Sequence, residues 1–158
     1  MHSAQDPSLK EDISLKQQSQ LPALFGLKII KDEDIEALRQ RCSQSMKGRT
    51  RICMHDSKES PLHVMLIAIS AGHYIGPHIS RCNGELLYII HTGRVLIGAE
   101  RSEVVLGDGG VKSLMIDKTK SRTIENLHSG ISLYWEIHIG PHMVGDTIWV
   151  DTQTLEKR

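Results

Sequence analysis

The stretch that decides the fold is GHYIGPHISRCNGE, residues 72–85. It contains a histidine and a serine two residues apart, and it ends in an Asn-Gly turn before a carboxylate. Alternate residues of a strand share one face, so His78 and Ser80 should point the same way. Glu85 should return on the next strand after the turn at Asn83-Gly84. We therefore predict that His78 and Glu85 converge on the inside of a sheet or barrel.

Short apolar segments continue in both directions from this stretch, and turns containing glycine separate them. Many short strands with regular turn signals are typical of an antiparallel sandwich or barrel. No long helix is expected between the strands, which argues against a parallel α/β sheet. The clearest strand candidates are Leu62–Ile69, Leu86–Ile90, Val95–Ala99 and Ile131–Ile139.

The N-terminal part of the chain is different in character. Residues 1–24 are mostly polar, and we expect a disordered tail followed by a single domain over residues 25–158. Residues 32–46 have helical periodicity, with Asp32 placed to cap the first turn. The apolar stripe of this short helix is narrow, so the helix should pack on a larger structure. The stripe consists of Ile35, Leu38 and Cys42.

The composition excludes several classes of function. Lys and Arg together number 19, as do Asp and Glu, and aromatic residues make up 4% of the 158 residues. A balanced charge and few aromatics argue against nucleic-acid binding. We find no apolar stretch of the roughly 20 residues that span a bilayer and no signal peptide. The three cysteines have no CxxC spacing, so we expect a reduced, cytoplasmic protein.

An imidazole and a carboxylate that converge inside a barrel suit a divalent metal such as Zn, Fe or Mn. His78 and Glu85 would be two metal ligands, whereas a catalytic metal usually has three from the protein. The same pair could instead exchange a hydrogen bond and act as catalytic acid and base. Cys82 could add a soft ligand or be a small buried apolar residue. We expect His55, His63, His128, His138 and His142 on surfaces or edges, and the direction of His91 stays open.

The spacing of these residues resembles the first motif of the cupin family, an antiparallel jelly-roll barrel. That motif has a glycine, two histidines, a glutamate and a closing glycine, which would correspond to Gly72, His78, Ser80, Glu85 and Gly93. Here Ser80 replaces the second histidine. The second cupin motif resembles residues 116–126, where Asn126 fits but Arg122 stands at the position of the ligand histidine. The resemblance implies a cupin-like barrel whose metal site is degenerate.

A longer resemblance, to the WbuC family of cupin-fold proteins, covers roughly residues 28–142. It implies a role with a sugar or sugar nucleotide in bacterial surface-polysaccharide biosynthesis, and small cupins often form homodimers. The elements that carry it are a short helix, Lys47–Arg51, a His-Asp-Ser turn at His55–Ser57, the strand Leu62–Ile69, the Pro77-His78 pair and Glu136–Pro141.

Arg122 changes what the barrel mouth could bind. A guanidinium cannot ligate a metal and is always charged, so it would repel a dication and attract an anion. Glu85 could pair with Arg122, or Arg122 and Arg81 could hold a phosphate or carboxylate, with Tyr88 as a further contact. If the alignment is shifted, Arg122 is instead solvent-exposed.

Three functions remain open at this point. The first is a cupin-type enzyme in which His78 and Glu85 bind a metal or exchange protons. In the metal-free version His78 moves the proton and Arg122 stabilises negative charge. The second is a metal-free module that binds a small, sugar-like or anionic ligand. The third is a structural protein that dimerises through an edge strand.

Overall fold

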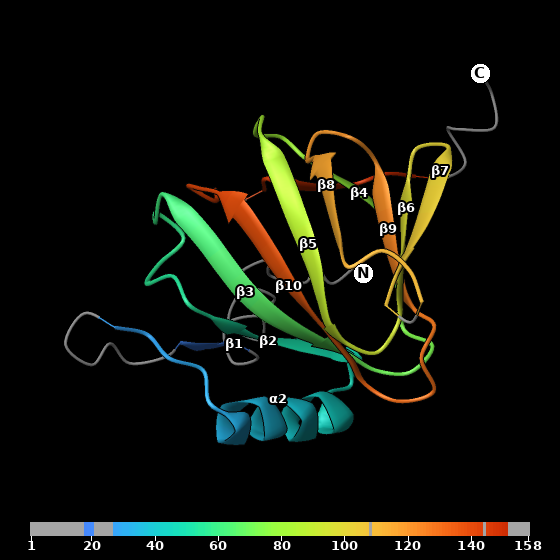
Figure 1. The fold of residues 1–158 in the computed structure, drawn as a ribbon. Coiled ribbons are helices and arrows are strands. Elements are labelled where there is room, and N and C mark those ends of the chain that lie inside the picture. Colours follow the sequence, from blue (N-terminus) through green and yellow to red (C-terminus); the bar gives the residue numbers. More distant parts are fainter. Residues whose placement is uncertain (1–17, 21–26, 108, 144, 152–158) are drawn as a thin grey trace, which may run out of the picture.

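The computed structural model describes residues 18–20, 27–107, 109–143 and 145–151 of the chain (Figure 1). These residues form one helix and a series of short strands. In chain order the elements are β1 (Gln18–Gln20), α2 (Asp32–Gln44), β2 (Arg49–Cys53), β3 (Leu62–Ile69), β4 (Tyr74–Ser80), β5 (Glu85–Thr92), β6 (Val95–Ala99), β7 (Ser102–Leu106), β8 (Ser113–Asp117), β9 (Arg122–Asn126), β10 (Ser132–Ile139) and β11 (Thr147–Trp149).

The strands form two sheets that face each other (Figure 1). The first sheet has the order β1-β2-β3-β10-β5-β8, and the second has the order β11-β4-β9-β6-β7. Apart from the parallel pair β1 and β2, neighbouring strands run antiparallel. Because the chain crosses repeatedly between the sheets, the architecture is a jelly roll. The prediction of a mainly β, antiparallel jelly-roll barrel with a short N-terminal helix is confirmed.

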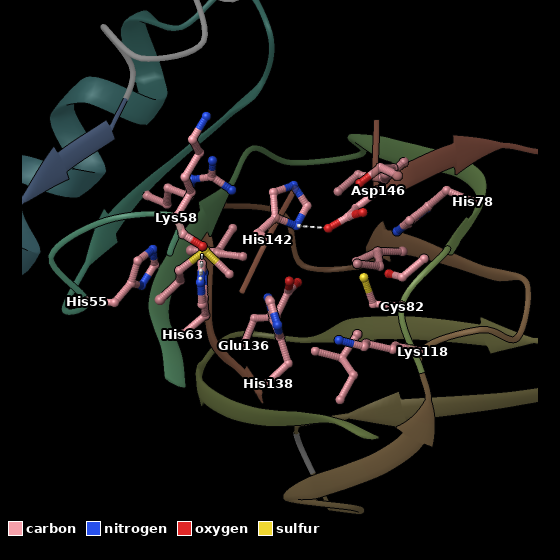
Figure 2. A pocket seen from close by; sticks show the side chains of 18 of the residues that line it. His55, Lys58, His63, His78, Cys82, Lys118, Glu136, His138, His142 and Asp146 are labelled. Carbon is pink, nitrogen blue, oxygen red and sulfur yellow. Dashed lines mark hydrogen bonds and ion pairs between the residues drawn. The ribbon is translucent and has the colours of Figure 1, made fainter. Parts of the chain in front are cut away.

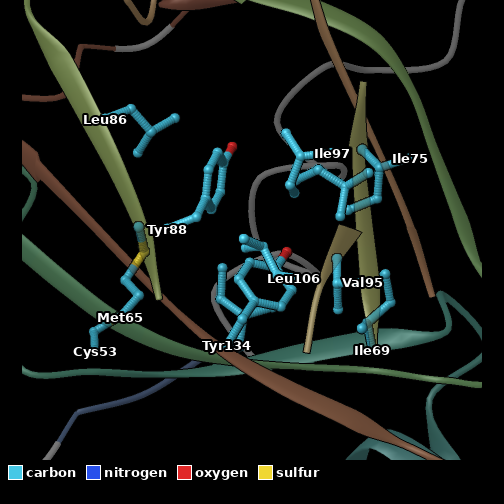
Figure 3. Close-up of a cluster of buried hydrophobic side chains, with 12 residues drawn as sticks. Cys53, Met65, Ile69, Ile75, Leu86, Tyr88, Val95, Ile97, Leu106 and Tyr134 are labelled. Carbon is cyan, nitrogen blue, oxygen red and sulfur yellow. The ribbon is translucent and has the colours of Figure 1, made fainter. Parts of the chain in front are cut away.

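Alternate side chains of both sheets fill the space between them. Tyr88 and Tyr134 lie at the centre, with ring centroids 5.9 Å apart in an edge-to-face arrangement (Figure 3). Such aromatic pairs stabilise a core beyond the area they bury. β-branched and other apolar residues of β3, β4, β6 and β9 surround the tyrosines. The same cluster also supplies the apolar floor of the cavity between the sheets.

Helix α2 covers the outer face of β2 and β3 (Figure 1). Leu38 and Cys42 are fully buried there in a second apolar cluster, so the predicted packing of the helix is confirmed. The helix ends at Gln44, two residues before its predicted end. Asp34, rather than the predicted Asp32, caps the N-terminal end of α2. Its carboxylate accepts a hydrogen bond from the backbone N–H of Lys31, the residue before the helix, at 2.9 Å. Asp32 is the first residue of the helix. In this type of cap, the side chain of the third helical residue, here Asp34, reaches back to the backbone N–H before the helix.

The expected N-terminal tail falls largely on residues that the structure does not describe. Gln18–Gln20, which belong to that segment, form β1 and pair with Arg51–Cys53 of β2. Among the described residues no helix combines the length and the apolar character needed to cross a bilayer.

Candidate functional site

A cavity of about 830 Å³ opens between the two sheets. Inward-facing residues of β2, β3 and β10 line one side, and residues of β4, β9 and β11 line the other. The floor is apolar and includes Met65, Leu86 and Tyr134, whereas the upper part is polar and charged. Figure 2 shows His55 and His63 at one side of this cavity and His78 and Lys118 at the other.

Arg122 reaches this cavity because β9 pairs with β4 and places it directly opposite His78. Its side chain is 5% exposed and lines the cavity. The alternative that Arg122 is solvent-exposed is therefore wrong. The guanidinium stands beside His78 at the barrel mouth, where the second cupin motif would have its ligand histidine.

Neutral groups hold the Arg122 guanidinium in place. Nε donates to the Tyr88 hydroxyl at 3.2 Å, Nη1 donates to the Lys118 carbonyl at 2.9 Å, and Nη2 donates to Ser80 Oγ at 3.3 Å. No carboxylate forms an ion pair with Arg122 in the part of the chain that the structure describes. The site therefore contains a buried positive charge whose orientation is set by three hydrogen bonds.

The turn between β8 and β9 adds a second buried cation, Lys118. Asp117 Oδ1 accepts from the Thr119 backbone N–H at 2.9 Å and from the Thr119 hydroxyl at 2.6 Å. This Asx-type turn takes the place of the Pro-x-Gly turn of the cupin motif. It turns Lys118 inward, where the side chain is 5% exposed and Nζ donates to the Ile139 carbonyl at 3.1 Å.

His78 is buried in the cavity wall and lies next to Trp149, with ring centroids 5.3 Å apart. A carbonyl can only accept, so Nδ1 donates its proton to the Gly76 carbonyl at 2.9 Å. Nε2 is then the basic nitrogen. Burial lowers the pKa of His78, the Gly76 hydrogen bond opposes this, and the charge of Arg122 lowers it further. The ring is therefore neutral at pH 7 and can accept a proton at Nε2.

Glu85 and Arg81 do not face the cavity. Leu86 and Tyr88 point inward along β5, so the alternation of the strand turns Glu85 outward, where it is exposed. β5 also belongs to the opposite sheet from β4, so Glu85 is not carried back toward His78. Arg81 is exposed as well, and its backbone N–H donates to the Asp146 carbonyl. The prediction that Glu85 converges with His78 or pairs with Arg122 is therefore wrong.

Tyr88 lies below the cavity rather than in its wall. It is fully buried, and burial raises the pKa of its hydroxyl far above the ordinary value. Its oxygen accepts the Arg122 Nε–H, so Tyr88 orients the guanidinium from beneath. Cys82 does line the cavity, on the same side as Asp146.

The residues at the cupin metal position do not fit a divalent cation. His78 is the one potential ligand there, since Ser80 accepts a hydrogen bond from Arg122 and Glu85 points away. A guanidinium beside the site would repel the metal. Across the described residues, no group of three or more His, Cys, Asp or Glu side chains is arranged to hold a metal ion.

A cluster of four histidines was missed by the sequence reasoning. His63, expected at a surface or edge, is 3% exposed, and His55 and His138 are half-buried in the same cavity. His142 lies at the rim of the cavity and is exposed, as expected. His63 and His138 are directly opposite each other on β3 and β10. His63 lies two residues from Met65, and His138 lies two residues from Glu136. Because residues two apart in a strand share a face, this spacing could have indicated that both histidines face inward. We call His55, His63, His138 and His142 the histidine cluster.

Comparison with known proteins supports the fold. Residues 30–99 match a family described as a domain of unknown function, DUF6016. No curated protein is significantly similar to the chain.

Three solved structures show the extent of the likeness. A cupin superfamily protein from Desulfitobacterium hafniense DCB-2 is 18% identical with a TM-score of 0.48, over 58% of this chain and 76% of that chain. An oxalate oxidase in complex with the substrate analogue glycolate is 12% identical with a TM-score of 0.55, over 68% of this chain and 58% of that chain. The protein TT1209 from Thermus thermophilus is 16% identical with a TM-score of 0.54, over 70% of this chain and 95% of that chain. At these identities the two structures with TM-scores above 0.5 show a shared fold and nothing about activity.

Proposed function

We propose that this cupin-fold chain binds an anionic small molecule in its cavity without a metal, through Arg122 and Lys118. The observation that carries the proposal is the buried Arg122 guanidinium, which has three neutral hydrogen-bond acceptors and no carboxylate partner within the described residues. A buried charge is costly unless it is paired. An anion from outside the protein would supply the missing partner.

The geometry leaves donors for such a ligand. A guanidinium has five N–H groups, and three of those of Arg122 are used. The two others can form charge-assisted hydrogen bonds to a phosphate or carboxylate. Lys118 adds an ammonium group on the same side of the cavity, with a backbone carbonyl as its hydrogen-bond partner.

The net charge of the lining also favours an anion. Six Lys or Arg residues line the cavity against four Asp or Glu residues. One of these four, Asp56, forms an ion pair with Lys28 outside the lining. Positive charge in a concave site raises the local concentration of anions and speeds their association.

A sugar phosphate or sugar nucleotide is the ligand class we favour. The cavity lies within the range of roughly 300–1,000 Å³ that is usual for small-molecule sites. Its apolar floor would contact a ring, and its charged upper part would contact a phosphate. The resemblance to the WbuC family supports a role in surface-polysaccharide biosynthesis. If the chain is an enzyme, His78 would exchange the proton at Nε2 and Arg122 would stabilise developing negative charge.

The working form and location of the protein belong to the same proposal. β7 and β8 are edge strands, and an edge strand can pair with a second copy to give a homodimer. We place the protein in the reducing cytoplasm, where thiols such as those of Cys42, Cys53 and Cys82 stay reduced.

The test is the affinity for inorganic phosphate and for UDP-glucose, measured by calorimetry on protein purified without chelators or a polyhistidine tag. Arg122→Met keeps most of the side-chain volume and removes the charge, so the fold should persist. We expect its affinity for phosphate to fall at least about tenfold. Arg101→Met is the matched control, because Arg101 is exposed and outside the cavity.

Two results would contradict the proposal. One is equal phosphate affinity in the wild type and Arg122→Met. The other is a near-stoichiometric metal that copurifies with the wild type and is lost in His78→Ala, which would favour the metalloenzyme. If neither phosphate nor UDP-glucose binds the wild type, the structural function is favoured instead.

A further inference from the structure

The histidine cluster forms because elements far apart in the sequence meet at the cavity. The ring centroids of His63 and His55 are 4.1 Å apart, and those of His63 and His138 are 5.0 Å apart. His142 joins from the β10–β11 loop, 6.3 Å from His63 and 6.5 Å from His138. Gly140 permits this approach, since a Cβ there would stand 2.0 Å from the Ser60 carbonyl oxygen and 2.6 Å from the His63 ring.

Two of the rings can accept a proton without losing a hydrogen bond. His63 Nε2 donates to the Lys58 carbonyl at 3.1 Å, and His138 Nδ1 donates to the Ile139 carbonyl at 3.2 Å. In each ring the other nitrogen carries the lone pair. No hydrogen bond engages His63 Nδ1 or His138 Nε2 within the part of the chain that the structure describes. Protonation of either ring would therefore add a charge and a donor.

In the empty cluster, His55, His138 and His142 favour the neutral form. The pKa of His55 is lowered to about 4, chiefly by burial and then by the neighbouring His63 and Arg51. Burial is also the largest cause that lowers the pKa of His138 and His142. Imidazolium rings this close would repel one another, so the cluster gains charge readily when a negative group accompanies the proton.

The surroundings of the cluster contain charges of both signs. Glu136 favours protonation of His138 and His142, and Asp146 does the same for His142, 3.8 Å from its Nδ1. At neutral pH the negative charges of these carboxylates repel an incoming anion. The neutral imidazole rings carry no positive charge that would balance this repulsion. The charged groups that face the cluster are Arg51 on β2, Lys58 and Glu59 in the β2–β3 loop, Glu136 on β10, Lys118 in the β8–β9 turn and Asp146 in the β10–β11 loop.

We infer that the histidine cluster is a second subsite for an anionic group, and that it binds this group together with protons. The inference rests on the proposed function for the class of ligand. Figure 2 shows His138 between His63 and Lys118, and His138 Nδ1 and Lys118 Nζ donate to the same Ile139 carbonyl, so the two subsites adjoin. A ligand with two anionic groups, such as a diphosphate, could occupy both.

Proton uptake gives the subsite a defined pH dependence. An anion beside the rings favours their charged form, so their protonation occurs at higher pH in the complex than in the free protein. Affinity then increases as the pH falls from about 8 toward about 5, by about tenfold per pH unit for each proton taken up. The affinity stops increasing at the pH at which the same histidine rings are already protonated in the free protein.

Sulfate is a suitable probe, because its charge is constant across this pH range. We would measure its affinity by calorimetry from about pH 8 to about pH 5, with chloride used to hold the ionic strength constant. Side-chain ¹H–¹⁵N spectra would report the protonation of each ring at the same time. In the wild type we expect affinity to rise as the pH falls and the titration of His138 to move to higher pH with sulfate.

The double variant His63→Gln/His138→Gln should lose most of the pH dependence but keep its affinity at about pH 8, which also shows that it is folded. His91→Gln is the matched control, because His91 is exposed on β5 and outside the cavity. A wild type without pH dependence, or a double variant that retains it, would overturn the inference.

Arg122→Met separates this inference from the proposed function. If the variant binds sulfate more weakly at about pH 8 but keeps the rise at low pH, both stand. If it binds as well as the wild type at about pH 8 and keeps the rise, the proposed function fails and the second subsite stands. If affinity depends on Arg122 but not on pH, the second subsite fails alone.

Discussion

Arg122 and His78 face each other across β9 and β4, and they determine the chemistry available at the barrel mouth. An imidazole at position 122 would add a lone pair for a metal, whereas the guanidinium adds a fixed positive charge. Ser80 then becomes a hydrogen-bond acceptor for Arg122 instead of a metal ligand. Compared with the cupin motif that the sequence resembles, Ser80 and Arg122 would therefore attract an anion and repel a cation.

Asn126 has a structural role at the other end of β9. Its amide donates to the carbonyls of Ile69 and Gly130 at 2.9 and 2.8 Å, and Oδ1 accepts from the His128 N–H and from the Ser132 hydroxyl. Asn126 is 2% exposed, so water has little access to the groups that hydrogen-bond to its side chain. This one residue connects both sheets and a loop.

We expect Asn126→Ala to lower the free energy of unfolding by about 3 kcal/mol, because it leaves buried groups unsatisfied. Urea denaturation would measure the change. Gln40→Ala, on the exposed face of α2, is the control and should change stability by less than about 0.5 kcal/mol. A loss from Asn126→Ala no larger than that of the control would show that water replaces the amide.

At the scale of the element, α2 has its own apolar cluster outside the barrel. Leu38 and Cys42 pack against Ile52 and Leu66, which alternate with the inward residues of β2 and β3. The first sheet is therefore apolar on both faces where the helix covers it. This explains why a narrow helical stripe suffices: the sheet supplies the rest of the buried surface.

Leu38→Ala should lower the free energy of unfolding by about 2–5 kcal/mol, as expected for a large-to-small change at a fully buried position. Denaturation followed by both fluorescence and circular dichroism would measure it. Met46→Ala is the control, since Met46 is fully exposed after the end of the helix. A cost below about 1 kcal/mol would mean that α2 contributes little to the cooperative fold.

At the scale of the whole molecule, four histidines with lowered pKa values line one cavity, and His73 lies outside it. Burial is the largest cause that lowers the pKa of His55, His73, His78, His138 and His142. In the unfolded chain these rings would titrate near the ordinary value of 6.5. The unfolded state therefore binds protons first as the pH falls.

The free energy of unfolding should consequently be highest above about pH 7 and should fall as the pH drops from 6.5 toward about 4, where His55 protonates in the folded state. Urea denaturation at a series of pH values would show the decline. The double variant His63→Gln/His138→Gln should show a smaller decline than His91→Gln. Constant stability between about pH 7 and about pH 5 would contradict this account.

The strands and the class of fold were predictable because their signals are local. Leu62–Ile69 and Val95–Ala99 form strands with the predicted bounds, since apolar residues and neighbouring turns determine where a short strand starts and stops. The position of Arg122 also followed from the spacing of the motif. The direction of the Glu85 side chain could not be predicted from the spacing, because it depends on which of the two sheets β5 joins.

The sequence by itself therefore determined an antiparallel barrel with a helix packed against it, and it singled out Arg122 as a charged residue of the barrel mouth. Tertiary structure alone decided which polar side chains share the cavity. The pairing of β3 with β10 brings His63 to His138, and the register shift between Ile75 and His78 in β4 changes the simple alternation. A one-residue shift of register reverses the face of every side chain, and such a shift depends on contacts between distant strands.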